Sequence, residues 1–437
     1  MDSLKTLLII LLVALSGCGS IKSQVTEPVG LHQLYIDANG DLLDPEGEQK
    51  IENEEKYVQS IIDNFYKEKQ SRPNLKLTIF IHGGLNTFES ATGRVKELRG
   101  SMLEDGRYPV FISWRSGGPS NYLDHLFFLR RGEKVNFVVG GLTSPFVLAE
   151  DLLRSLARTP ASTWNVLVGQ NSVARWITDD EEQAYFSSVD ELINLGFNVE
   201  RVGNINGHGF EHFWSIWNPA KVFTAPFVDG LGTGSWNSML RRTDLVLRRN
   251  DGFDGLTEYE SETAATKFFR KLSEEHRDEE LLLIGHSMGT IIANNIVSRF
   301  QELHFSEIVY MAAACTVKDI ELVIAPYLYN NQKSRFYNLS LNPYRDILES
   351  NFFDFAPRGS LLIWIDDTLG TVNSFQNKTA GFWFNIVRGA SEAFKDPSVR
   401  SRVVLTRFGI ADSTPQNHGD FDEAGNEFWN EQFWNGR

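Results

Sequence analysis

The chain has 437 residues, of which 42% are hydrophobic and 12% aromatic, and its formal net charge is -15. This composition supports a large buried core, in one elaborated domain or in two. The negative charge argues against nucleic acid as a partner, because phosphate binding needs clustered lysine and arginine. No metal-binding motif, phosphate-binding glycine loop or dinucleotide fingerprint occurs in the sequence, so we expect no metal and no cofactor.

The beginning of the chain indicates export. Ten mostly apolar residues, 6–15, follow Lys5. A helix across a bilayer needs about 20 residues, so this run is typical of a signal peptide instead. Leu15-Ser16-Gly17-Cys18 then resembles the lipobox of bacterial lipoproteins.

That resemblance implies a signal peptide over residues 1–17, lipidation of Cys18 and a tether over residues 18–30. The protein would then be a lipid-anchored lipoprotein of the cell envelope, with the membrane as a partner through its acyl chains. Gly19 is not the aspartate that often retains lipoproteins in the inner membrane, so the outer membrane is favoured. An ordinary cleaved signal peptide is the alternative.

Further along, short apolar runs alternate with helical patterns. Asn39-Gly40 between two apolar runs predicts a hairpin. Strands are predicted from Leu77 and over 110–114, 281–284, 308–314, 336–341 and 403–408, and helices over 52–70, up to 103, and over 257–276, 290–303 and 317–329. This alternation predicts an α/β protein with a mostly parallel central sheet covered by helices on both faces.

A long insertion after Trp114 breaks the alternation and holds five of the ten tryptophans. We expect residues 116–256 to form a cap, or lid, over an active site; a structural insert with its own core is the alternative. Its most apolar stretch, VNFVVGGLTSPFVLAEDLL, is interrupted by Asn136, Thr143 and Pro145, so it is not predicted to span a membrane.

Gly285-His286-Ser287-Met288-Gly289 stands between a buried strand and a helix. In this context the pattern G-x-S-x-G forms a sharp turn that exposes the serine oxygen above the sheet. The positive end of the following helix favours negative charge there. We therefore predict that Ser287 is a nucleophile.

With this motif, residues 31–115 and 257–425 resemble an α/β-hydrolase core, with residues 257–437 completing it to the end of the chain. The resemblance implies an oxyanion hole built from the N–H of Met288 and a second N–H, from Gly84 or Leu85, in the loop that begins His82-Gly83-Gly84. His82 and His286 are expected to be structural.

The base and the acid of such a site follow the serine in the order acid, then histidine. Only His304 and His418 lie beyond Ser287, and His418 follows the last predicted strand, where the base of the family belongs. Asp346 is the preferred acid, because it follows the penultimate predicted strand.

Asp366 or Asp367 would replace Asp346 if SLLIWI, residues 360–365, were a strand rather than a helix; Glu349 and Asp354 lie in the same region. Asp420 and Asp422 are expected to be solvated, although either could tune the pKa of His418.

These residues predict a serine hydrolase, similar to lipases and esterases, that cleaves a small carboxylic ester with an acyl or aromatic group through an acyl-enzyme. An amidase, peptidase or thioesterase would use the same triad. A non-catalytic envelope lipoprotein that keeps the scaffold for binding is the alternative from another class.

Overall fold

The computed structural model describes residues 29–130, 133–169, 188–202, 219–249, 261–350, 356–370, 372–409 and 415–436. The predicted signal peptide, Cys18 and nearly all of the tether lie outside the described residues, as does Asp354.

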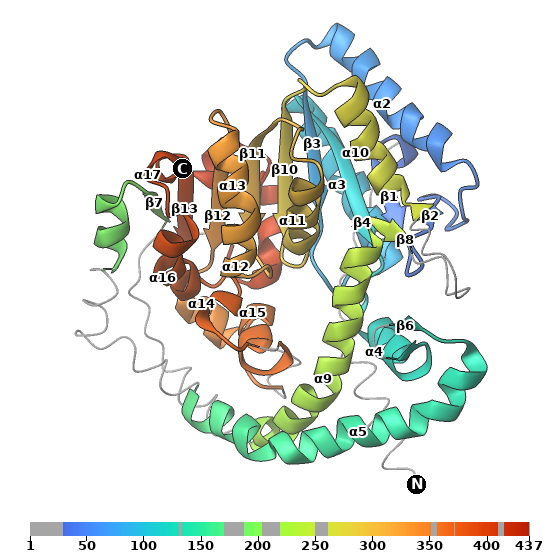
Figure 1. The fold of residues 1–437 in the computed structure, drawn as a ribbon, viewed down its shortest axis with the longest axis vertical. Helices are drawn as coiled ribbons and strands as arrows, with labels where there is room; N and C mark the ends of the chain where they lie inside the picture. Colours follow the sequence, from blue (N-terminus) through green and yellow to red (C-terminus); the bar gives the residue numbers. More distant parts are fainter. Residues whose placement is uncertain are drawn as a thin grey trace.

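Nine strands form the central sheet (Figure 1). Their order is β2 (Leu42–Leu43), β1 (Gln33–Ile36), β4 (Arg107–Trp114), β3 (Lys76–Ile81), β10 (Leu281–His286), β11 (Phe305–Met311), β12 (Arg335–Ser340), β13 (Val403–Phe408) and β7 (Asn198–Val202). Every neighbouring pair is parallel except β1 and β2, which form the predicted hairpin with Gly40 at a φ of 85°. The prediction of a mostly parallel α/β sheet is confirmed.

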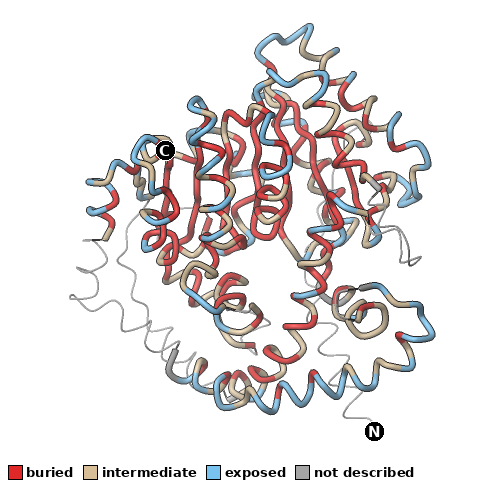
Figure 2. Tube along the Cα trace, in the orientation of Figure 1, coloured by how far each residue is buried: buried red, intermediate tan, exposed pale blue. Residues whose placement is uncertain are grey.

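Helices flank this sheet, with α10, α11 and α13 toward the viewer in Figure 1. Each has an amphipathic pattern or a cap; in α2, for example, Asn53 accepts the N–H of Lys56 and every third or fourth residue is buried. The bounds are α2 (Glu54–Ser71), α3 (Phe88–Glu104), α10 (Ala264–Glu275), α11 (Gly289–Arg299), α13 (Ala325–Asn330) and α16 (Trp383–Ala393). The central strands form the buried core, drawn in red in Figure 2.

The inserted region has two parts. Helices α4 (Gly118–Phe127), α5 (Phe137–Trp164) and α9 (Pro219–Leu245) form a layer beside the core, with α5 along its outer rim (Figure 1). Strand β7 also belongs to the insertion, yet it pairs with β13 as the last strand of the central sheet. Residues 116–256 therefore contribute to the core sheet as well as to the layer beside it.

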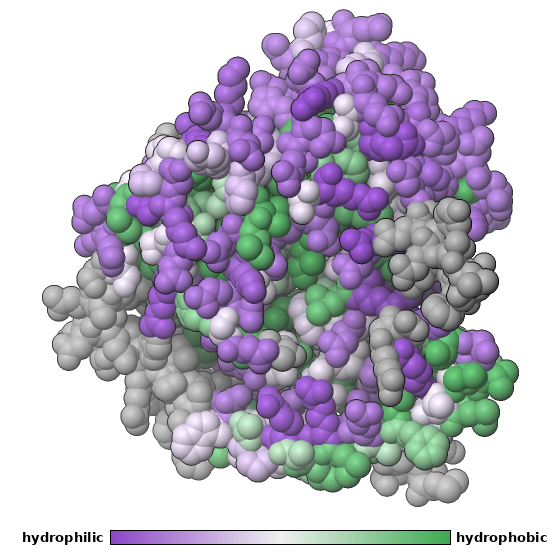
Figure 3. Space-filling view, viewed as in Figure 1, coloured by the Kyte–Doolittle hydropathy of each residue, from purple (hydrophilic) through white to green (hydrophobic). Residues whose placement is uncertain are grey.

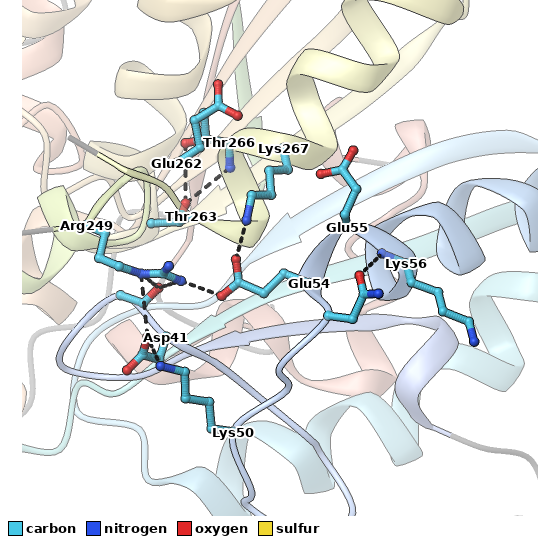
Figure 4. Close-up of polar contacts among 12 residues, drawn as sticks. Asp41, Lys50, Glu54, Glu55, Lys56, Arg249, Glu262, Thr263, Thr266 and Lys267 are labelled. Atoms are coloured by element: carbon cyan, nitrogen blue, oxygen red, sulfur yellow. Dashed lines mark hydrogen bonds and ion pairs between the residues drawn. The ribbon is translucent and has the colours of Figure 1, made fainter. Parts of the chain in front are cut away.

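The chain returns from the insertion through a cluster of charged residues, shown in Figure 4. Glu54, at the start of α2 and 6% exposed, accepts hydrogen bonds from Arg249 and, at 2.7 Å, from Lys267 on α10. The guanidinium of Arg249 also lies 3.5 Å from Asp41 in the β1–β2 turn. A buried carboxylate between two cations is stabilised by both, so this cluster fixes the end of the insertion to the hairpin and to two core helices.

Candidate active site

Ser287 occupies a strained turn between β10 and α11. Its φ is 51°, a left-handed value that costs a non-glycine residue about 1–3 kcal/mol. Three main-chain hydrogen bonds hold it there: its N–H donates to Met311 (2.8 Å) and its carbonyl accepts from Thr290 and Ala314 (both 3.1 Å). Glycine is required at position 289, because a Cβ there would lie 2.2 Å from the carbonyl oxygen of Ile81. The local sequence thus forces the serine side chain out of the line of the strand.

His418 lies against this serine. Its Nε2 is 2.8 Å from Ser287 Oγ, across 131 residues of sequence, and the two side chains are 7% and 2% exposed. Burial and the nearby His286 lower the pKa of His418 to about 3, so its ring is neutral at pH 7. A neutral Nε2 without a proton accepts the hydroxyl hydrogen of Ser287, which is the arrangement that proton transfer needs.

A chain of polar contacts holds the main chain of His418. The Nε2 of His286 lies 2.9 Å from the His418 carbonyl oxygen, and its Nδ1 lies 3.5 Å from Asp422. Arg94 on α3 lies 3.2 Å from the Asp422 carboxylate; burial alone would raise the pKa of Asp422, but its interactions with His286 and Arg94 hold that pKa well below the usual range. The expectation that Asp422 is solvated is wrong: it is 5% exposed, because the short helical turn after His418 folds back toward α3.

Asp420, by contrast, caps that turn from the partly exposed side. Its carboxylate accepts the N–H groups of Gln416 (3.0 Å) and Asn417 (2.8 Å). It therefore shapes the loop that carries His418.

The loop after β3 packs on the serine turn. A Cβ on Gly83 would lie 2.9 Å from the Cβ of Ser287, and one on Gly84 would lie 2.8 Å from the Met288 sulfur. The N–H of Leu85 is already engaged, since it donates to Ser116 at 3.0 Å. Within the described residues, the N–H groups of Gly84 and Met288 donate to no main-chain carbonyl. Main-chain carbonyls therefore occupy neither of these two N–H groups.

His82 and Asn86 brace this loop. The Trp114 N–H donates to His82 Nε2 (3.1 Å), so the proton of the ring is on Nδ1, which donates to Gly83 at 2.7 Å. Burial lowers the pKa of His82 to about 4, so its ring is neutral at pH 7. The Asn86 amide donates to the Gly83 carbonyl at 3.1 Å. No motif in the sequence predicted this contact.

Two acidic residues lie in α14 (Pro343–Leu348) or directly after it. Glu349 accepts the main-chain N–H of His418 at 2.8 Å, and burial raises its pKa to about 7. Asp346 is fully buried, and burial raises its pKa well above the usual value. Among the described residues, neither oxygen of Asp346 has a partner in hydrogen-bonding geometry, and neither has Nδ1 of His418.

Asp366 and Asp367 lie in a helical segment, since residues 361–369 are helical rather than a strand. The carboxylate of Asp366 accepts hydrogen bonds from the Thr379 N–H (2.8 Å) and the Asn385 amide (2.6 Å). These contacts occupy Asp366 away from His418. Burial raises the pKa of Asp367.

Other candidate groups do not join this site. Cys315 is a buried thiol whose pKa burial raises far above its usual value. In the part of the chain that the structure describes, no cluster of histidine, cysteine or acidic side chains suits a metal ion. A hollow of about 610 Å³ lies at the opposite, amino ends of β3 and β10, lined by Tyr66, Lys69 and Glu279 among others.

Comparisons with known proteins identify no family for this chain. No protein-family model, curated protein or solved structure matches the chain.

Proposed function

We propose that the protein is a serine hydrolase of the α/β-hydrolase type that acts on carboxylic esters. The observation that carries the proposal is the 2.8 Å contact between Ser287 Oγ and His418 Nε2, at a strained turn between a buried strand and a helix. A serine held in this backbone conformation costs stability, and such strain is concentrated at functional sites. The order serine, carboxylate, histidine along the chain agrees with this class of enzyme.

In the proposed reaction, His418 accepts the hydroxyl proton of Ser287 as Oγ attacks the ester carbonyl carbon. The carbonyl oxygen becomes an anion and receives hydrogen bonds from the N–H groups of Met288 and Gly84. His418 then donates its proton to the departing alcohol, which leaves the acyl group on Ser287. Water repeats the sequence with His418 as base, and the carboxylic acid leaves.

The carboxylate proposed to orient His418 is Asp346. Glu349, the residue after α14, contacts the main chain of His418, and Asp346 lies three residues before it in the last turn of the helix. A buried carboxylate without partners and a buried imidazole nitrogen without one each cost about 1–3 kcal/mol, and pairing them removes both costs. Glu349 is then a positioning residue that holds the His418 main chain.

Access to the serine requires movement, because Ser287 is only 2% exposed. Helix α9 approaches the site: the Met239 methyl group would lie 3.9 Å from a Cβ on Gly84. We propose that α9 and the rest of its layer act as a cap that uncovers Ser287. We further propose that lipidated Cys18 attaches this enzyme to the envelope, at the outer membrane.

A fluorophosphonate probe tests the proposal, since it labels activated serines. We expect labelling of the wild-type chain, unchanged labelling of Ser298→Ala on the exposed side of α11, and none of Ser287→Ala. A panel of esters, thioesters and amides then assigns the leaving group. Absence of labelling in the folded wild type, at neutral pH and after prolonged incubation, would favour the non-catalytic scaffold.

A further inference from the structure

Helix α5 has its polar side toward the protein. Its buried residues are small or polar: Gly140, Asp151, Ser155 and Ser162. The Asp151 carboxylate lies 3.2 Å from His125 and accepts the Tyr122 hydroxyl at 3.1 Å, both from α4. A surface helix in water normally buries its apolar side, so α5 has the reverse polarity.

The outward side of α5 is apolar along its whole length. Six large side chains with exposed fractions between 64% and 77% follow one another at helical spacing: Val138, Leu142, Phe146, Leu153, Leu156 and Trp164. We call these six residues the α5 stripe. In Figure 3 hydrophobic atoms gather along the lower rim of the molecule, where α5 runs. A contiguous apolar surface of this kind marks a binding site rather than ordinary exposure.

The contacts beneath the stripe are those of helices that pack without apolar side chains. A Cβ on Gly230 of α9 would lie 1.9 Å from the Ser155 hydroxyl, and one on Gly140 would lie 1.6 Å from the Phe127 carbonyl oxygen. Asp229 of α9 accepts hydrogen bonds from Ser162 (3.1 Å) and Arg158 (3.0 Å). Small residues in close approach and polar pairs between helices are typical of helices whose surroundings are lipid.

We propose that the α5 stripe binds the surface of a lipid bilayer, with α5 lying in the plane of the interface. No helix in the described residues is long and apolar enough to cross a membrane. Four residues of α5 are charged: Asp151 is buried, Arg158 is partly exposed and pairs with Asp229, and Glu150 and Arg154 are exposed. A helix with one long apolar side and few outward charges fits the boundary between headgroups and acyl chains.

Charge and chain length identify the surface further. The net charge of -15 opposes both a second copy of the chain and an anionic membrane, so the stripe fits neutral, zwitterionic lipid. Ten residues lie between Cys18 and Val29, the first described residue, so these two residues are at most about 40 Å apart. An acyl anchor at Cys18, if present as proposed, would therefore hold Val29 within about 40 Å of the bilayer.

Vesicle flotation of the full chain carrying Cys18→Ser tests the proposal, because this variant has no acyl anchor. We expect it to float with vesicles of phosphatidylcholine and phosphatidylethanolamine. Adding Leu142→Asp and Phe146→Asp should lower the bound fraction at least about tenfold, because a carboxylate resists transfer into hydrocarbon. Adding Leu322→Asp and Tyr329→Asp, whose side chains are 61% and 58% exposed elsewhere on the protein, should leave flotation unchanged.

A second pair, Leu153→Asp with Leu156→Asp, repeats the test on the other half of the stripe, and circular dichroism checks that each variant is folded. Equal flotation of the stripe variants and the control variants would overturn the proposal, as would a Cys18→Ser chain that does not float. Conversion of a dimer to a monomer by the stripe variants, without any flotation to lose, would assign the stripe to a second copy instead. Flotation is measured without substrate, so its result is independent of the proposed hydrolase activity.

Discussion

The central sheet and helix α5 use opposite rules within one chain. In the sheet, large aliphatic side chains such as Leu283 are inside and fully buried. In α5, small and polar residues are inside, and residues such as Leu142 are outside with 72% of their surface exposed. The sheet is thus stabilised by the hydrophobic effect in water, whereas α5 is held by close backbone approach and hydrogen bonds. The difference teaches that apolar content alone does not locate the core of this protein.

The largest expected effect is on kcat, at the carboxylate proposed to orient His418. Asp346→Asn should lower kcat about 10⁴-fold, since an amide does not hold the imidazole of His418 in the required tautomer. Glu349→Gln should change kcat less than about tenfold, because the amide oxygen still accepts the His418 N–H. Ester hydrolysis by both purified variants measures this, and the reverse ranking would make Glu349 the orienting acid.

Truncation of one leucine in each region compares the two rules directly. Leu283→Ala should destabilise the protein by about 2–5 kcal/mol, because it opens a cavity in the sheet. Leu142→Ala should change stability by less than about 0.5 kcal/mol in the absence of lipid. Urea denaturation measures both; a large loss for Leu142→Ala would mean that the α5 stripe is covered in solution.

The pH dependence of stability should report the buried imidazole of His82. The pKa of His82 in the folded state, about 4, is below its value in the unfolded state. Its contribution to the free energy of unfolding is therefore fully present above a pH of about 6.5 and is lost as the pH falls from there toward 4. The loss is about 3 kcal/mol for this group. The pKa values of Glu349 and Asp366 are raised in the folded state, so these groups stabilise the protein as the pH falls. They therefore offset part of the loss due to His82.

A variant without this imidazole isolates the effect. We expect the stability difference between wild type and His82→Gln to shrink on acidification from pH 7 to pH 4, in urea denaturation at each pH. Parallel stability curves for the two proteins would contradict a neutral buried His82.

The smallest expected effect concerns backbone conformation. Ser287→Gly should be more stable than Ser287→Ala by about 1 kcal/mol, since only glycine adopts a φ of 51° without steric cost. Ala157→Gly on α5 should have the opposite sign and cost about 1 kcal/mol, as in any helix interior. Thermal denaturation of the three variants measures both differences, and equal stability of the two Ser287 variants would argue against strain at the turn.

Much of the sheet could be predicted from sequence because its strands are short apolar runs separated by helical patterns. Strand β13 has the predicted bounds, and β12 differs by one residue at each end. Strand β11 ends at Met311, three residues early, because Ala312 turns with a φ of 44°. Strand β7, with the sequence NVERV, escaped prediction because an edge strand that is largely exposed carries no apolar run.

In the site, Ser287 and the glycine loop could be found from local sequence motifs. The tertiary contacts of the acidic residues could not be predicted from such motifs. Asp422 was expected in solvent because it stands in a polar loop, and only the fold shows Arg94 and His286 beside it. Glu349 lies 69 residues from the main-chain N–H that it accepts. Contacts of that range depend on how helices end and loops return, which composition and periodicity do not encode.

The pairing of β7 with β13 has a consequence for how the chain is made. Asn198 pairs with Val404, 206 residues later. At a synthesis rate of about 5–20 residues per second, the edge strand is complete roughly 10–40 s before its partner exists. Strand β3 waits similarly for β10, since Leu77 pairs with Leu281. The sheet therefore cannot complete its pairing until β13, near the carboxyl end of the chain, has been made.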